Sequence, residues 1–144
     1  MKIGFTGTQI GMTTEQDVAV RGIIARLIDN ITEVHAGDCI GSDKQFIEIV
    51  KQICPKAKTI GHIPDNDYKR AKLKYDEERT PKPYLVRNQD IVDECDVLIA
   101  TPKELSIQLR SGTWSTVRKG VKAGKIVWVI YTNGDIKNYD TNCR

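Results

Sequence analysis

The stretch Arg110-Ser-Gly-Thr-Trp-Ser-Thr-Val-Arg118, which follows the apolar run Val97-Leu-Ile-Ala100, decides the class of fold. The apolar run indicates a buried strand, and the stretch places a turn of small residues between that strand and a helix. Phosphate binds at such points in open α/β sheets, because backbone N–H groups at a helix start point outward and the helix dipole favours an anion. Arg110 adds a charge, and Ser111 and Thr113 add hydroxyls.

Two further loops of the same kind follow apolar segments. Thr6-Gly-Thr-Gln9 comes after the predicted strand Met1-Lys-Ile-Gly-Phe5, and Gly37-Asp-Cys-Ile-Gly-Ser-Asp43 comes after Glu33-Val-His-Ala36. Ligands of open α/β sheets bind outside the carboxyl ends of the strands. Three strand ends rich in Gly, Ser and Thr therefore predict one crevice for a nucleotide-like ligand.

The rest of the pattern alternates strands with amphipathic helices. Strands are predicted at 2–5, 33–36, 58–63, 96–100 and 125–131, and helices at 13–28, 42–53, 84–95 and 113–123. Such alternation favours a mostly parallel sheet covered on both faces. We therefore expect an α/β protein, a Rossmann-like three-layer sandwich with about five strands. Residues 1–134 would form a single nucleotide-binding domain and residues 135–144 a polar C-terminal tail.

The segment from Tyr68 to Tyr84 differs from its surroundings, since it is rich in Lys, Arg, Glu, Asp and Pro and has little apolar periodicity. One interpretation is a solvated helix and loop. The other is a mobile lid over the crevice, which would account for so long a connection in a small domain.

Bulk properties narrow the class of protein. The chain has 144 residues with 40% hydrophobic and 28% charged residues and a net charge of +3, as expected of one globular domain. No apolar run approaches the length of a membrane span, and we expect a cytoplasmic protein.

No Cys or His pattern has metal-ligand spacing, so neither a metal nor a cofactor is expected. A reactive thiol at Cys39, in a predicted ligand loop, is the less favoured alternative to a plain thiol.

Three motifs together resemble the SLOG superfamily, the Rossmann-like group that includes DNA-processing protein A and the Lonely guy phosphoribohydrolases. They are Gly4-Phe-Thr-Gly-Thr8, His35-Ala-Gly-Asp-Cys-Ile-Gly-Ser-Asp43 and Arg110-Ser-Gly-Thr-Trp-Ser-Thr-Val-Arg118. The resemblance spans most of residues 1–134. It implies a nucleotide or nucleotide-derived ligand over the strand ends and frequent homodimers.

The chain departs from the phosphoribohydrolases at a key acid. Their Gly-Gly-x-Gly-Thr-x-x-Glu pattern carries a glutamate that supports cleavage of the N-glycosidic bond, whereas Trp114-Ser-Thr-Val117 has none and Arg118 follows it. A catalytic acid would have to come from elsewhere, with Asp38, Asp43 and Glu104 as candidates. Turn and helix-cap roles are the alternatives for Asp38 and Asp43.

The predicted ligand-binding residues fall in the three loops and in the helix after the polar segment. Turn glycines, hydroxyl caps and solvated charges are the alternatives for most of them, and a place in the core is the alternative for Trp114. His35 is expected to be structural, and His62 either structural or facing the ligand. The full set of predicted ligand-binding residues is Gly4, Thr6, Gly7, Thr8, Gly37, Gly41, Ser42, Arg87, Asn88, Arg110, Ser111, Gly112, Thr113 and Trp114.

Three functions follow as hypotheses. The first is a nucleotide-binding protein that hydrolyses or transfers at the N-glycosidic bond of its ligand. The second is a non-catalytic sensor or sequestering protein for a nucleotide-derived signal, as in some bacterial or phage defence members of the resembled superfamily. The third is single-stranded DNA binding, which the mild charge and the 6% aromatic content disfavour.

Overall fold

A seven-stranded sheet forms the centre of the molecule in the computed structural model, which describes residues 1–109 and 111–139. The spatial order is β4-β3-β2-β1-β5-β6-β7. All neighbours are parallel except β6 and β7, which are antiparallel. The strands are β1 (Lys2–Gly7), β2 (Glu33–Ala36), β3 (Lys58–Pro64), β4 (Glu77–Lys82), β5 (Val97–Thr101), β6 (Ile126–Ile130) and β7 (Ile136–Tyr139).

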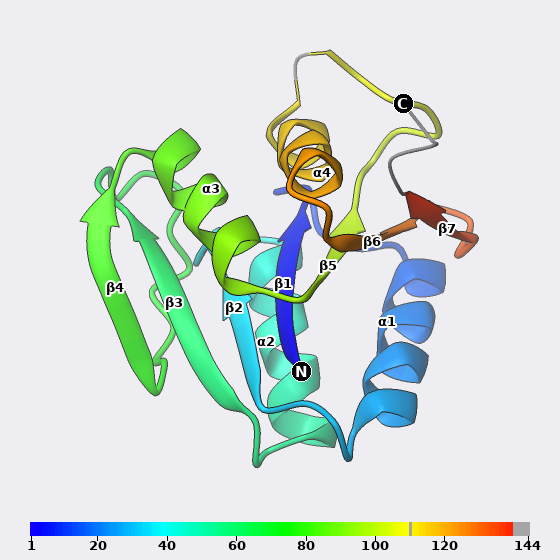
Figure 1. Cartoon of the computed structure of the whole chain (residues 1–144), viewed down its shortest axis with the longest axis horizontal. Helices are drawn as coiled ribbons and strands as arrows, with labels where there is room; N and C mark the ends of the chain where they lie inside the picture. Colours follow the sequence, from blue (N-terminus) through cyan, green and yellow to red (C-terminus); the bar gives the residue numbers. More distant parts are fainter. Residues whose placement is uncertain (110, 140–144) are drawn as a thin grey trace.

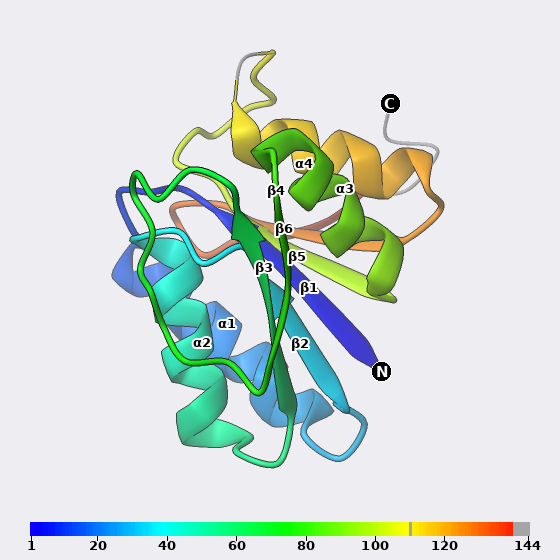
Figure 2. The ribbon, with the colours of Figure 1, turned by 90° about the vertical axis from the view of Figure 1, so that its left-hand side faces the viewer.

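Four helices cover the two faces of the sheet. They are α1 (Thr14–Leu27), α2 (Ser42–Ile53), α3 (Tyr84–Glu94) and α4 (Gly112–Lys122). Figures 1 and 2 show α1 and α2 side by side on one face and α3 and α4 on the other. The three-layer α/β class expected from the alternating pattern is therefore confirmed.

Two apolar clusters hold the layers together. On the face of α1 and α2, Phe5 of β1 stacks on Phe46 of α2 with ring centroids 4.3 Å apart. On the other face, Trp114 of α4 packs near Tyr131 and Tyr139 with Leu98 of β5 in the same cluster. The central strands are apolar on both sides because both of their faces are covered.

The sheet has two more strands than the sequence predicts. β4 occupies part of the segment interpreted as a solvated helix and loop, and it pairs in parallel with β3. Its sequence, Glu77-Glu-Arg-Thr-Pro-Lys82, carries no apolar alternation because this edge strand is largely exposed. β7 lies in the expected C-terminal tail, and its Tyr139 is 5% exposed. Residues 136–139 therefore belong to the sheet, and the remaining tail residues 140–144 lie outside the described part of the chain.

The strand order places the candidate site. Chain order runs outward from β1 through β2 to β3 on one side, while β5 lies on the other side of β1. The direction in which strands are added to the sheet thus reverses between β1 and β5, and such a switch point leaves a crevice outside the carboxyl ends of the strands. Within the described residues, no helix is both long and apolar enough to span a membrane.

Candidate functional site

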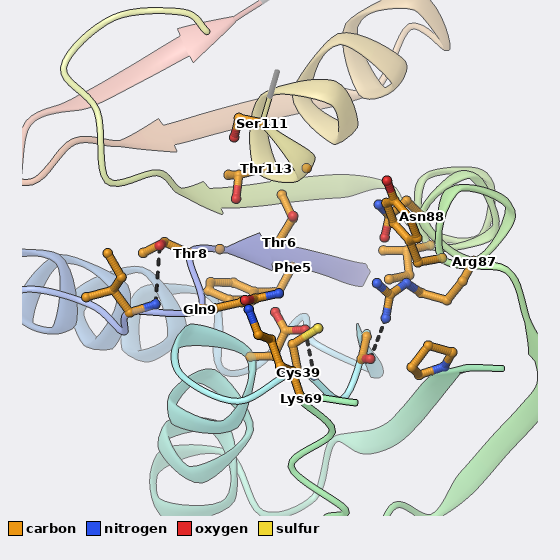
Figure 3. A pocket seen from close by; sticks show the side chains of 18 of the residues that line it. Phe5, Thr6, Thr8, Gln9, Cys39, Lys69, Arg87, Asn88, Ser111 and Thr113 are labelled. Atoms are coloured by element: carbon orange, nitrogen blue, oxygen red, sulfur yellow. Dashed lines mark hydrogen bonds between the residues drawn. The ribbon is translucent and has the colours of Figure 1, made fainter. Parts of the chain in front are cut away.

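A cavity of about 750 Å³ lies over the carboxyl ends of β1, β2 and β5. This volume falls within the range of ligand pockets, roughly 300–1,000 Å³. The three loops predicted from the sequence meet there, together with the first turns of α3 (Figure 3). The predicted site residues that line the cavity are Thr6, Gly7, Thr8, Gly37, Asp43, Arg87, Asn88, Glu104, Ser111, Gly112 and Thr113.

The N-terminus of α4 forms one wall. Ser111 is the N-cap, and its hydroxyl oxygen accepts a hydrogen bond from the backbone N–H of Trp114 at 3.3 Å. The other backbone N–H groups of a first turn have no acceptor within their own helix, and the helix dipole adds a partial positive charge. Gly112, Thr113 and Ser111 all line the cavity, so this wall suits an anionic group. Arg110, predicted to bind phosphate here, lies outside the described residues.

The loop after β1 forms the floor of the cavity, and hydrogen bonds from other segments of the chain fix its shape. The carbonyl oxygen of Thr8 accepts hydrogen bonds from the Ser42 backbone N–H at 3.1 Å and from the Ser42 hydroxyl at 2.7 Å. The Thr8 N–H donates to the carbonyl of Thr101 at 3.1 Å. A side chain at Gly7 would collide with Ser42 and Thr101, so only glycine permits this approach. Ser42 is fully buried and does not line the cavity, which assigns it to support rather than to ligand contact.

Arg87 and Asn88 enter from the first turns of α3 and are each 7% exposed (Figure 3). The Nη1 of Arg87 donates to the carbonyl oxygen of Gly37, while its Nε is buried without a hydrogen-bond partner. A side chain at Gly37 would collide with the guanidinium. Burying a guanidinium is costly unless its donors are used, and among residues 1–109 and 111–139 no acceptor pairs with the Nε.

Two carboxylates lie in the cavity wall. Asp43 of α2 accepts a hydrogen bond from the Cys39 N–H at 3.1 Å, and burial raises its pKa to about 6, opposed by the Arg87 charge. Glu104 has a buried Oε2 atom with no hydrogen-bond partner in the part of the chain that the structure describes. The Asp43 carboxyl, with a pKa of about 6, is suited to proton transfer near neutral pH. Burial and the Asp43 carboxylate raise the pKa of the Cys39 thiol, which disfavours the reactive thiolate considered for this loop.

Asp38, predicted as a catalytic candidate, is instead a structural anchor. Its carboxylate is fully buried and does not line the cavity. One oxygen accepts from the Leu73 N–H at 3.1 Å and the Tyr75 hydroxyl at 2.8 Å, and the other from Arg70 Nε at 2.9 Å and the Lys72 N–H at 3.2 Å. With hydrogen bonds to both of its oxygens, Asp38 fixes the segment before β4, which does not fit the alternative interpretation of a mobile lid.

Three other predicted ligand residues also lie away from the cavity. A Cβ at Gly4 would meet the Cys95 side chain, so this glycine permits close packing of α3 on β1. Gly41 has φ +81 and backs against the Gln9 carbonyl, which makes it a turn glycine. Trp114 is fully buried in the apolar cluster of α4, so its indole cannot stack on a ligand base.

Sequence reasoning missed several lining residues, among them Asn66, Tyr68, Lys69 and Tyr84. Tyr68 and Tyr84 are 75% and 56% exposed and stand at the two ends of the polar segment, for which a lid over the crevice was one of two interpretations, without individual contact residues. It also missed the meeting of His35 and His62, which are fully buried and do not line the cavity. Their contact joins neighbouring strands and has no local sequence signal.

No protein-family model matches the chain, and no curated protein matches its sequence. Solved structures do resemble it. A molybdenum cofactor binding protein from the phototrophic bacterium Rippkaea orientalis has a TM-score of 0.65 and 23% identity, over 90% of this chain and 76% of that one. DNA processing protein A from Streptococcus pneumoniae has a TM-score of 0.67 and 20% identity, over 89% of this chain and 49% of that one.

A third similar structure is DNA processing protein A from Helicobacter pylori, described for its single-stranded DNA binding mode. Its TM-score is 0.64 and its identity 21%, over 90% of this chain and 64% of that one. These structures have SLOG-type Rossmann-like folds, so the resemblance seen in the three motifs is confirmed at the level of the fold.

Proposed function

We propose that this protein binds a nucleotide or nucleotide-derived ligand across the carboxyl ends of its strands. The observation that carries the proposal is the convergence of the α4 N-terminus, the loop after β1 and the buried Arg87 on one cavity of about 750 Å³. Helix N-termini and arginine forks are the usual binders of phosphate in proteins. The phosphate is assigned to Ser111, Gly112 and Thr113, with Thr6 and Thr8 beside it.

The remaining walls suit the other parts of a nucleotide. The exposed rings of Tyr68 and Tyr84 line the cavity and offer aromatic faces for a base. Asp43 and Asn88 offer a carboxylate and an amide, which are the groups that hydrogen-bond ribose hydroxyls. The ligand would thus lie with its phosphate toward α4 and its sugar toward α2 and α3.

Catalysis at the N-glycosidic bond is the enzymatic form of this proposal. Asp43 is its strongest candidate, because its carboxyl faces the cavity and has a pKa of about 6. Glu104 is the second candidate, since it carries an unpaired buried oxygen. The sensor form of the proposal uses the same contacts without turnover.

Single-stranded DNA is kept as a competing ligand. The similar Helicobacter protein is described for binding it, and Lys69 and Lys103 add cations to the cavity wall. A DNA-binding surface would show affinity that falls steeply with salt, because each phosphate contact releases counterions. The molybdenum cofactor is likewise named by a similar structure and belongs among the ligands to be tested.

The testing experiment is isothermal titration calorimetry with nucleoside monophosphates, cyclic nucleotides, NAD-derived compounds, molybdenum cofactor and a short single-stranded DNA, followed by chromatography of the products. One nucleotide should bind with 1:1 stoichiometry and weaken roughly tenfold in Lys103→Met, as expected for one lost charge contact. Lys56→Met, at an exposed position outside the cavity, is the matched control.

Each outcome is decisive. Release of a free base establishes the glycosidase, and a ligand recovered intact establishes the sensor. Binding of DNA alone with a steep salt dependence replaces the proposal, and no binding by any compound overturns it. The homodimer implied by the resemblance is proposed as well, and the mass from light scattering during size-exclusion chromatography tests it.

A further inference from the structure

The two histidines of the chain meet on the face of the sheet that α3 covers, outside the cavity. His35 lies on β2 and His62 on β3, and α3 packs against both strands (Figure 1). The Nδ1 of His35 is 2.8 Å from the Nε2 of His62, and both rings are buried. Two imidazole nitrogens directed at one point, with a carboxylate nearby, are a common arrangement in metal sites.

The outer nitrogen of His35 fixes which atom faces His62. Its Nε2 is 3.0 Å from a carboxylate oxygen of Glu33, which only accepts hydrogen bonds. The ring proton therefore belongs on Nε2, and Nδ1 presents a bare lone pair to His62. Metal-binding histidines are held in the same way, by a carboxylate on the ring nitrogen opposite the metal.

Glu94 of α3 supplies the third group. Its Oε2 is 3.7 Å from the Nε2 of His62, and the three potential ligand atoms lie within 4.8 Å of one another. Arg79 binds mainly the other oxygen, Oε1, at 2.6 and 3.1 Å, and reaches Oε2 only at 3.3 Å. Arg79 thus orients the carboxylate while leaving the oxygen nearest His62 the less engaged of the two.

We propose that His35, His62 and Glu94 bind a divalent transition metal ion, of which Zn²⁺ is the best match. Zinc takes nitrogen and carboxylate ligands at about 2.0–2.2 Å, which small side-chain rotations reach from the observed spacing. The side chain of Glu94 is 33% exposed, so the site opens to solvent on that side, where the ion enters and water completes its coordination.

The local charges agree with a cation. Glu33, Glu94 and Asp90 act on the rings with negative charges, and Arg79 acts on both rings with a positive one. Binding at the Nε2 of His62 requires its proton to occupy Nδ1, a buried atom with no hydrogen-bond partner among the described residues. Moving this proton costs free energy, which lowers the affinity of the site for the metal. The free energy of metal–ligand bonding must be larger than this cost.

Metal binding is measured on tag-free full-length protein stripped with a chelator, by calorimetry with Zn²⁺ and by the absorption spectrum of Co²⁺. Because the chain contains only two histidines, histidine-dependent binding reports this site alone. We expect one ion per chain and an affinity at least tenfold lower in both Glu94→Gln and His62→Asn. Glu48→Gln, an exposed carboxylate on α2, is the matched control and should bind as the wild type does.

The Glu94→Gln variant keeps the experiment decisive if His62→Asn does not fold, since Glu94 is partly exposed. Absence of stoichiometric Zn²⁺ binding would overturn the proposal, as would equal affinity in wild type and Glu94→Gln. Binding that survives in Glu94→Gln but is lost in Cys39→Ser would place the metal in the cavity instead and also overturn it.

Discussion

The loop after β2 and the start of α4 have similar compositions but use their polar groups differently. In the loop, Asp38 engages both its oxygens with the chain, and Gly41 serves a turn. At α4, Ser111, Gly112 and Thr113 all line the cavity. The difference teaches that a Gly- and Ser-rich loop presents free donors and acceptors to a cavity only where the surrounding chain leaves them unused.

The largest effect should come from the anchor of the β2 loop. In Asp38→Asn, an amide N–H₂ would face donors from Arg70 or Leu73 and leave buried groups unsatisfied. We expect the free energy of unfolding to fall by about 3–5 kcal/mol, the usual cost of breaking a buried ion pair. Urea denaturation measures it.

Asp43→Asn is the control for Asp38→Asn, because Asp43 accepts a hydrogen bond from the Cys39 N–H, which an amide oxygen also accepts. Its unfolding free energy near pH 4, where the folded Asp43 carboxyl is protonated, should change by less than about 1 kcal/mol. If both variants lose the same stability, the contrast between anchor and cavity residue fails.

Asp43 itself should make stability depend on pH. Its pKa is about 6 in the folded protein, above its ordinary value, because burial disfavours the charged form. The stability linked to the protonated Asp43 carboxyl is therefore fully present at low pH, below the unfolded pKa. It is lost as pH rises through about 6. Relative to Asp43→Asn, the wild type should lose about 2–3 kcal/mol between roughly pH 4 and pH 8.

This pH effect is followed by urea denaturation of the wild type and Asp43→Asn in parallel across the range. Taking the difference between the two proteins removes the contributions of all other titrating groups. A flat difference would show that Asp43 is not buried as a charge, and the argument for its proton-transfer role would lapse.

Substitution of the glycines in the two regions should destabilise the protein to different extents. Gly41→Ala places a Cβ against the Gln9 carbonyl at φ +81, so we expect a loss of about 1–3 kcal/mol. In Gly112→Ala the new Cβ meets no atom of the described residues within 4 Å, so stability should change by about 0.5 kcal/mol or less. Thermal unfolding compares them, and equal losses would contradict the distinction between scaffold and cavity glycine.

A smaller loss than that of Asp38→Asn is expected at the N-cap of α4. Ser111→Ala removes the acceptor for the Trp114 N–H and should cost about 1 kcal/mol of unfolding free energy. Ser111→Asp restores an acceptor and the stability, but its charge should weaken binding of an anionic ligand at this wall. Calorimetry on both variants separates cap from ligand contact; unchanged affinity in Ser111→Asp would remove Ser111 from the phosphate site.

Local patterns predicted much of the fold. The apolar runs and helix periodicity gave the five inner strands and all four helices, with α3 found at Tyr84–Glu94 against the predicted 84–95. β4 and β7 were missed because edge strands need not alternate apolar and polar residues. The three loops were correctly expected to share one crevice, since parallel strands end at one edge.

The sequence by itself determined the layers, the parallel sheet and the loops that meet above it, because periodicity and turn residues act over short distances. Only the tertiary structure decided that Asp38 is an anchor, that Asp43 faces the cavity and that His35 meets His62. Those roles depend on contacts between residues 27 or more positions apart, such as the 2.8 Å contact of the two histidines. A side chain's chemistry follows from its burial and partners, which packing sets.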